Sequence, residues 1–231
     1  ARVRLLADDG GIRFLAGDGV GMITLPGMKL PVGEAAINPV PRQMIEQAVR
    51  QVFPTRAAEV TVSIPGGVEL AKKTFNPRLG VVGGLSVLGT TGVVHPMSEE
   101  ALKETIRLEL SIRRNQGADE IGLVFGSQGE TAAAALFPGL QTVQMSNFVG
   151  FALDSAAELG LSRVILLGQP GKLVKVSGGS MQTHSQYGDG RRETLMAHLA
   201  LMDAPLSLLE FVHQSVTLDG CIVPIHEAGF D

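Results

Sequence analysis

The chain has 231 residues, 45% of them hydrophobic and 18% charged, which is the composition of an ordinary globular protein with one large or two small domains. Its formal net charge of −4 provides no basic face for nucleic acid, so a local cluster of positive charge must meet any anionic ligand. The single cysteine, Cys221, excludes an intrachain disulfide framework and a cysteine-cluster metal site, and we expect it to be a small apolar packing residue.

No apolar run reaches the length that spans a membrane, and no signal-peptide pattern opens the chain. We therefore expect a cytoplasmic protein without a membrane partner, and the apolar composition leaves room for a homo-oligomer. The chain begins at Ala1, and residues 2–6 are typical of a strand entered midway. We expect the natural protein to have residues before Ala1.

The first eighty residues predict a mixed α+β region. Weak alternation over residues 12–24 is interrupted by Gly17–Asp18–Gly19–Val20–Gly21. So many glycines in a strand predict a bulge or a close approach by another backbone segment. A helix is predicted over 42–52. Its buried stripe should consist of Met44, Ile45, Ala48, Val49 and Val52.

Residues 59–64 alternate as a strand, and residues 69–75 predict a short helix. The stretch that follows places four cationic and amide side chains directly before an apolar run over 81–88: Lys72, Lys73, Asn76 and Arg78. That run predicts a buried strand that ends in Gly89–Thr90–Thr91–Gly92. A glycine-rich turn between a strand and a helix lets backbone N–H groups approach a ligand, although its glycines can equally serve backbone geometry alone.

From Ser98, a good N-cap, a helix is predicted to about residue 116. Three further strands, predicted at 121–125, 142–145 and 164–167, alternate with helices, of which one runs from Asn147 to about Leu159. With the strand at 81–88, this alternation predicts a parallel α/β layer. We therefore expect an α/β protein with a partial α+β domain over 1–80. A Rossmann-like domain over 81–231 should end in helices at 191–202 and 206–216.

In parallel sheets, ligands bind outside the carboxyl ends of the strands. The four predicted strands lead into glycine-bearing or polar loops, which are expected to converge on one edge: Gly89–Gly92, Gly126–Glu130, Ser146–Asn147 and Gly168–Lys172. The alternative for each loop taken alone is a plain connector.

The polar segment over 174–191 is expected to form a loop that covers this edge. Its His184 could be an acid/base group, a carboxylate partner or a metal ligand, but the commoner alternative is a hydrogen-bonded structural histidine. The other histidines are scattered and support no metal site. Motifs of serine hydrolases, zinc proteases and P-loop proteins do not occur, nor does a carboxylate pair of the glycosidase kind.

Six segments occur in an order that resembles the cobalt-precorrin-5B C1-methyltransferase family of the anaerobic cobalamin pathway. They are GDGVG (17–21), VGEAAINPVPRQMI (32–45), ELAKKTFNPRLGVVGGLSVLGTTG (69–92), HPMS (95–98), GKLVKVSGG (171–179), and THS with DGR (183–185, 189–191). The resemblance covers nearly the whole chain, but the family's N-terminal portion, which includes a Gly-Tyr-Thr-Thr-Gly-like segment, has no counterpart here. The family implies methyl transfer from S-adenosylmethionine to C1 of cobalt-precorrin-5B, with cobalt present only as part of this corrinoid substrate.

The chemistry of the residues, taken with this reaction, leads to a hypothesis for individual roles. Cofactor contacts would come from Gly89, Thr90, Thr91, Gly92, Gly126, Ser127, Gly129 and Glu130, with Glu130 at the ribose hydroxyls. Contacts to the carboxylate-rich macrocycle would come from Asn38, Arg42, Lys72, Lys73, Arg78 and Arg191. No catalytic residue is assigned, and His184 and Asn76 are the candidates for that role. Two alternatives stay open: a dinucleotide-dependent reductase of a corrin precursor, and a corrinoid-binding module without catalysis.

Overall fold

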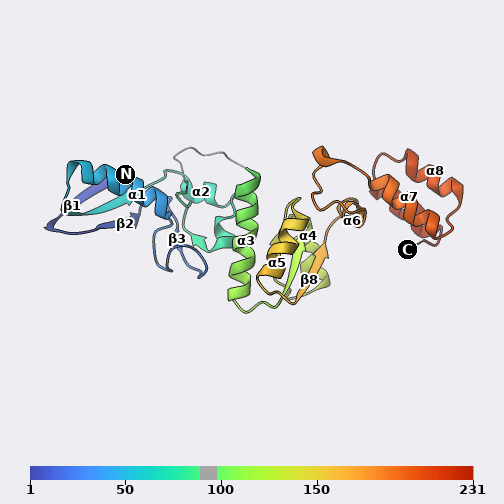
Figure 1. Ribbon diagram of the computed structural model, residues 1–231, viewed down its shortest axis with the longest axis horizontal. Helices are drawn as coiled ribbons and strands as arrows, with labels where there is room; N and C mark the ends of the chain where they lie inside the picture. Colours follow the sequence, from blue (N-terminus) through green and yellow to red (C-terminus); the bar gives the residue numbers. More distant parts are fainter. Residues whose placement is uncertain (89–97, 231) are drawn as a thin grey trace. The chain divides into compact units, whose positions relative to one another are not determined.

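The structure, a computed structural model, describes residues 1–88 and 98–230. Its packing divides the chain into two compact units, Ala1–Gln116 and Gly117–Asp231 (Figure 1). No helix within the described residues has both the length and the apolar character needed to cross a membrane.

A three-stranded sheet opens the first unit, in the order β1-β4-β2. The strands are β1 (Arg2–Asp9), β2 (Ile12–Ala16) and β4 (Arg56–Val62). β1 is antiparallel to the central β4, whereas β2 is parallel to it. Parallel neighbours require a crossover connection, and here the crossover carries α1 (Pro39–Val52).

α1 confirms the predicted helix but begins three residues earlier, at Pro39. The prediction of its buried stripe was only partly right. Val49 is buried against Ala58 and Val60 of β4, but Met44 and Val52 are 48% and 67% exposed. The helix contacts the sheet along a line narrower than its apolar face, so part of that face remains open to solvent.

The glycines at 17–21 allow three backbone segments to meet, as their density predicted. Gly19 has a φ of +73°, and a Cβ added at either Gly67 or Gly84 would overlap its carbonyl group. Two short strands, β3 (Met22–Ile23) and β5 (Val81–Val82), pair antiparallel beside this contact. The glycines are therefore required where the chain passes closest to itself.

The rest of the first unit consists of α2 (Gly67–Ala71), the 3₁₀ turn η1 (Asn76–Leu79) and α3 (Glu99–Asn115). Ser98 caps α3 as predicted, because its hydroxyl accepts a hydrogen bond of 3.2 Å from the amide of Ala101.

The predicted strand over 81–88 was wrong in extent and in place. Only Val81–Val82 forms a strand, and it pairs with β3 in the first unit and not with the parallel sheet. The strand ends before Gly83, whose φ of +87° is not a strand conformation, and Leu85 and Val87 form only isolated bridges with Val20 and Ile37. The packing consequently divides the chain after Gln116, whereas the sequence had suggested a boundary near residue 80.

A parallel sheet of three strands, in the order β7-β6-β8, is the centre of the second unit. Its strands are β6 (Glu120–Val124), β7 (Thr142–Gln144) and β8 (Arg163–Leu167). They are connected by α4 (Ser127–Leu136) and α5 (Val149–Glu158). The central strand is apolar and fully buried at Ile121, Leu123 and Val124. These strands confirm the predicted α/β class.

Four helices follow the sheet: α6 (Pro170–Ser177), α7 (Arg191–Leu201), α8 (Leu206–Gln214) and α9 (Asp219–Glu227). The last three enclose a core of Leu199, Leu208, Val212, Leu218 and Cys221, which confirms the cysteine as a buried packing residue. α7 and α8 were predicted, but α6 and α9 were not. The expected covering loop was therefore wrong over residues 174–177, which are helical.

Candidate functional site: a cationic pocket beside α6

Three loops meet at the carboxyl edge of the parallel sheet. The side-chain amide of Gln169, after β8, donates a hydrogen bond to the side-chain oxygen of Gln128, after β6. The ammonium of Lys172 donates to the side-chain oxygen of Asn147, after β7, over 2.7 Å. The predicted convergence is thus confirmed for the loops after β6, β7 and β8. The fourth loop, Gly89–Gly92, lies outside the described residues.

A pocket of about 380 Å³ lies next to these loops, within the second unit. Its lining comes from the start of α6, the segment before η2 (Ser185–Tyr187), the start of α7 and the turn into α9. Its charged or titratable lining residues are Lys172, Lys175, His184, Arg191 and Asp219. Of these, His184 and Arg191 were predicted as ligand contacts from the sequence.

The two lysines of α6 are held by backbone and amide oxygens. Lys175 is only 6% exposed, and its ammonium donates to the carbonyls of Thr183 and Gly188 over 3.3 and 3.1 Å. Lys172 donates to the Thr183 carbonyl over 3.2 Å as well as to Asn147. Burial, followed by the neighbouring charges of Lys175 and Arg191, lowers the pKa of Lys172.

Arg191 forms the other wall of the pocket at the first residue of α7. Its Nε donates to the carboxylate of Asp189 over 2.6 Å, and a second bond runs from Nη2 to the other oxygen. The hydrogen bonds from Arg191 lower the pKa of Asp189 to about 2, against the opposing effect of burial. The same bond raises the pKa of Arg191, to which the charge of Asp219 adds.

His184 is exposed at the rim of the pocket and caps η2. Its Nδ1 accepts a hydrogen bond of 3.2 Å from the amide of Gln186, so the neutral ring carries its proton on Nε2. This bond matches the structural reading of the residue and leaves the Nε2 side to face a ligand.

The glycine-bearing loop after β6 forms the first turn of α4. Gly126 has a φ of +146°, a conformation that favours glycine. Gly129 is buried, and a Cβ there would lie 2.9 Å from the Cβ of Val124, so it lets α4 pack on β6. Ser127 and Glu130 lie on the same turn, where backbone N–H groups and the helix dipole favour anionic or polar ligand atoms.

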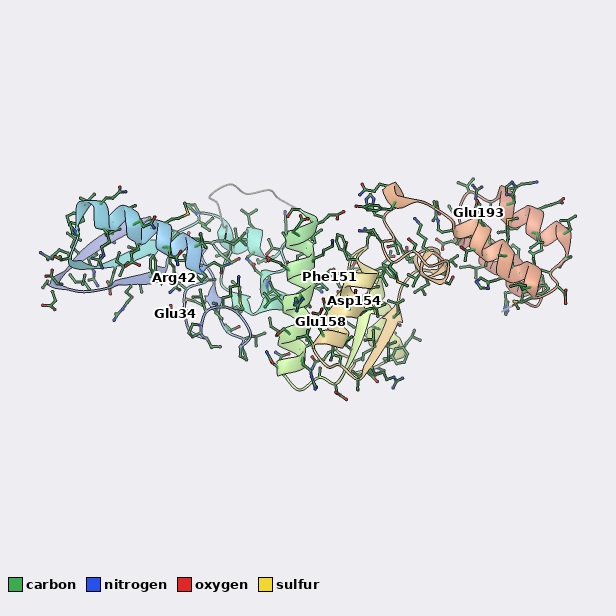
Figure 2. The ribbon with its side chains drawn as sticks, viewed as in Figure 1. Glu34, Arg42, Phe151, Asp154, Glu158 and Glu193 are labelled. Atoms are coloured by element: carbon green, nitrogen blue, oxygen red, sulfur yellow. The ribbon has the colours of Figure 1, made fainter. Side chains whose placement is uncertain are left out.

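The other predicted substrate residues belong to the first unit, and several already contact protein groups. Arg42 donates to the carbonyls of Ile37 and Ala35, lies 3.0 Å from the carboxylate of Glu34, and covers the ring of Phe14. Figure 2 shows Arg42 and Glu34 side by side. Arg42 also lines a second cavity, of about 450 Å³, along β2.

The other predicted cations and amides of the first unit lie in different environments. Lys72 pairs with Glu69 over 2.7 Å, and Arg78 lies 3.9 Å from the buried carboxylate of Glu109. The side chain of Asn76 accepts a hydrogen bond from Ser86. Asn38 is the N-cap residue of α1 without a side-chain cap bond, and Lys73 is exposed.

Sequence reasoning placed Lys172 at the end of the loop Gly168–Lys172, but it named neither lysine of the pocket as a ligand contact. Lys172 and Lys175 are three residues apart in GKLVK, a spacing that places both side chains on one face of a helix. That spacing was the available signal. It places both lysines on one face only if residues 170–177 form a helix, whereas the sequence predicted loops on both sides of residue 173.

Comparison with known proteins gives two family matches. A model described as CbiD matches residues 1–96, and a model described as the CbiD C-terminal domain matches residues 182–231. Curated relatives called "Cobalt-precorrin-5B C(1)-methyltransferase" are similar over almost the whole chain. The protein from Photorhabdus laumondii is 48% identical over 99% of the chain, and that from Citrobacter koseri is 46% identical over 100%. A relative from Alkaliphilus metalliredigens is 45% identical over 95%.

The chain spans about three fifths of the length of these relatives, namely 61%, 61% and 59%. Among solved structures, a cobalamin biosynthesis protein (cbiD) from Archaeoglobus fulgidus is 26% identical, with a TM-score of 0.30. That match covers 83% of this chain and 60% of the other.

Proposed function

Because the chain belongs to the CbiD family, we propose that it catalyses methyl transfer from S-adenosylmethionine to C1 of cobalt-precorrin-5B, giving cobalt-precorrin-6A in cobalamin biosynthesis. The observation that carries this proposal is an identity of 45% to 48% with relatives of that name, over 95% to 100% of the chain. We propose a cytoplasmic enzyme that acts on a small corrinoid substrate.

The bound methyl donor supplies a methyl group on a positively charged sulfur. The electron pair of the ring carbon forms the new C–C bond while the pair of the S–C bond returns to sulfur. Such a displacement needs alignment of three atoms and exclusion of water more than a strong base. The pocket offers cations, a side-chain amide and an imidazole, which can hold a polar ligand in a fixed orientation.

We propose that the first turn of α4 binds the methyl donor. Gly126, Ser127 and Gly129 would bring backbone close to the ligand, and Glu130 would accept hydrogen bonds from the ribose hydroxyls. The bond between Gln128 and Gln169 places this turn next to the start of α6. Gly89, Thr90, Thr91 and Gly92 remain proposed cofactor contacts on the strength of the family resemblance.

We propose that the substrate is contacted by the predicted residues Asn38, Arg42, Lys72, Lys73, Arg78 and Arg191. Asn76 and His184 would be further polar contacts. Three of these cations have a protein carboxylate nearby, so a substrate carboxylate would compete with Glu34, Glu69 or Glu109. Arg191 is in the same position with respect to Asp189. Competition of this kind favours a ligand that presents several carboxylates at once.

The proposal is tested by incorporation of a labelled methyl group from S-adenosylmethionine into cobalt-precorrin-5B. The assay compares this chain with a chain extended to the length of its relatives, and labelled cobalt-precorrin-6A is the expected product. Calorimetry provides the control: S-adenosylhomocysteine should bind and a nicotinamide dinucleotide should not. The reverse pattern would contradict methyl transfer and favour a reductase.

A further inference from the structure

We infer that the pocket beside α6 is a carboxylate-binding site, in which Lys172 and Arg191 contact the ligand and Lys175 holds a fixed positive charge beneath them. The identity of the ligand rests on the proposed function. The chemistry of the site rests on the Gly117–Asp231 unit alone, since every group involved belongs to it.

Two helices deliver the three cations to one place. Lys172 and Lys175 are separated by three residues in α6 and share a face of that helix. Arg191 begins α7, and its Nη1 lies 3.5 Å from the position that a Cβ at Gly171 would occupy. The guanidinium therefore lies directly beside the first turn of α6, next to Lys172.

The buried charge of Lys175 is the strongest single indication of a ligand. The residue as a whole is buried, and its ammonium donates hydrogen bonds to the carbonyls of Thr183 and Gly188. A buried ammonium is costly compared with an apolar side chain of similar volume. Fold stability alone would favour an apolar residue here, so we attribute the charge to something that the pocket holds.

The balance of charge in the pocket also favours an anion. Three cations, Lys172, Lys175 and Arg191, face two carboxylates, Asp189 and Asp219, which leaves one positive charge when His184 is neutral. The neighbouring cations lower the pKa of Lys172 after the effect of burial, so its ammonium is repelled by the others. An anion placed among them relieves this repulsion.

The donors suit a carboxylate. The planar guanidinium of Arg191 can bind two oxygens, as it does with Asp189, and an ammonium beside it adds a third donor. Carboxylates occur in both partners of the proposed reaction, namely at the amino-acid end of the methyl donor and in the acetate and propionate arms of the corrinoid. A volume of about 380 Å³ accepts a small molecule or one arm of a larger ligand.

Calorimetry on the whole chain distinguishes these sources with ligands matched in pairs. S-adenosylhomocysteine is compared with 5′-methylthioadenosine, which lacks the amino-acid carboxylate. A corrinoid with free carboxylates is compared with its methyl ester, and tricarballylate serves as a small probe. The variants are Lys172→Met, Arg191→Gln and Asp189→Asn. The control is Arg163→Gln, an exposed arginine of the same unit at the start of β8, away from the loops.

We expect Lys172→Met and Arg191→Gln each to weaken the carboxylate-bearing ligand by about tenfold or more, and to leave its matched partner unchanged. The pair that responds identifies the source of the carboxylate. Asp189→Asn should strengthen binding, because it releases donors of Arg191 and removes a negative charge. A misfolded variant would not bind more tightly, so this variant separates a binding role from a structural one.

The inference is overturned if Lys172→Met and Arg191→Gln weaken both members of the responding pair equally, or if they weaken the carboxylate-bearing member of neither pair. If neither S-adenosylhomocysteine nor the corrinoid binds the unmodified chain, the proposed function fails, and tricarballylate then decides the question of the pocket. Tricarballylate binding that is weakened by Lys172→Met would support the site. No binding of tricarballylate to the unmodified chain would refute it.

Discussion

Asp189 and Arg191 make the stability of the second unit depend on pH at one defined position. The pKa of Asp189, about 2, lies below the value of about 3.9 for an unfolded chain. The pair therefore stabilises the fold above pH 4, and this contribution is lost as the pH falls from about 4 to about 2. Both side chains are partly exposed, so the contribution is below about 1 kcal/mol.

We predict that Asp189→Asn lowers the free energy of unfolding at pH 7 by less than about 1 kcal/mol, and that the difference shrinks as the pH falls to 3. Urea unfolding at both pH values measures it. Asp154→Asn, at an exposed position of α5 (Figure 2), is the matched control for the loss of a carboxylate. A difference that grows towards low pH would contradict this account.

At the level of single residues, the sequence predicted charge and polarity but not the neighbours of each group. His184 and Arg191 were predicted as ligand contacts and both line one pocket. Arg42, Arg78 and Arg191 carry the same kind of charge, and each lies near a protein carboxylate. The residue type could not reveal this, because a cation that binds a ligand and a cation that pairs with the protein have the same side chain.

Single elements were predictable where periodicity was strong. β6 has a continuous apolar run, and α3 has a capping serine and charges matched to its dipole, so both were predicted correctly. The prediction of β5 failed because its apolar sequence over 81–88 is typical of a strand, whereas the positive φ of Gly83 limits the strand to two residues. α9 was missed because Gly220 and Pro224 oppose a helix, and the burial of Cys221 against α7 and α8 overrides that preference.

The contact among the glycine loops gives a prediction about packing. Gly84→Ala places a methyl group against the backbone of Gly19, which side-chain rearrangement cannot relieve. We expect the first unit to lose at least about 1–3 kcal/mol of unfolding free energy. Gly11→Ala is the matched control, because a Cβ there meets nothing within 4 Å. Chemical denaturation of both variants measures the difference, and equal stability would show that the backbone yields at this point.

On the scale of the whole molecule, composition and the alternation of strands with helices predicted an α/β protein, and the structure belongs to this class. The position of the division was less predictable, because it depends on which strand β5 joins, and pairing between strands far apart in sequence leaves no local signal. The candidate site illustrates the same limit. Its cations come from α6 and α7, and only the folded second unit brings Lys172 next to Arg191.

The division after Gln116 predicts that the chains 1–116 and 117–231 each fold when they are produced separately, since each unit has its own core. We expect each to show a cooperative thermal transition and dispersed amide signals in nuclear magnetic resonance spectra. A shorter chain that ends at residue 80 should fold less well, because it lacks β5 and α3. Absence of a cooperative transition for 117–231 would show that this unit depends on the rest of the chain.

The sheet of the second unit ends on one side at β8, whose sequence RVILL has hydrogen-bonding groups along an edge that no described strand occupies. Such an edge can act as a template on which another copy adds its own strand, and four consecutive aliphatic side chains would strengthen the association. Concentrated samples of the isolated unit would therefore tend to form a fibrous precipitate. A lysine introduced within the aliphatic run would reduce this association.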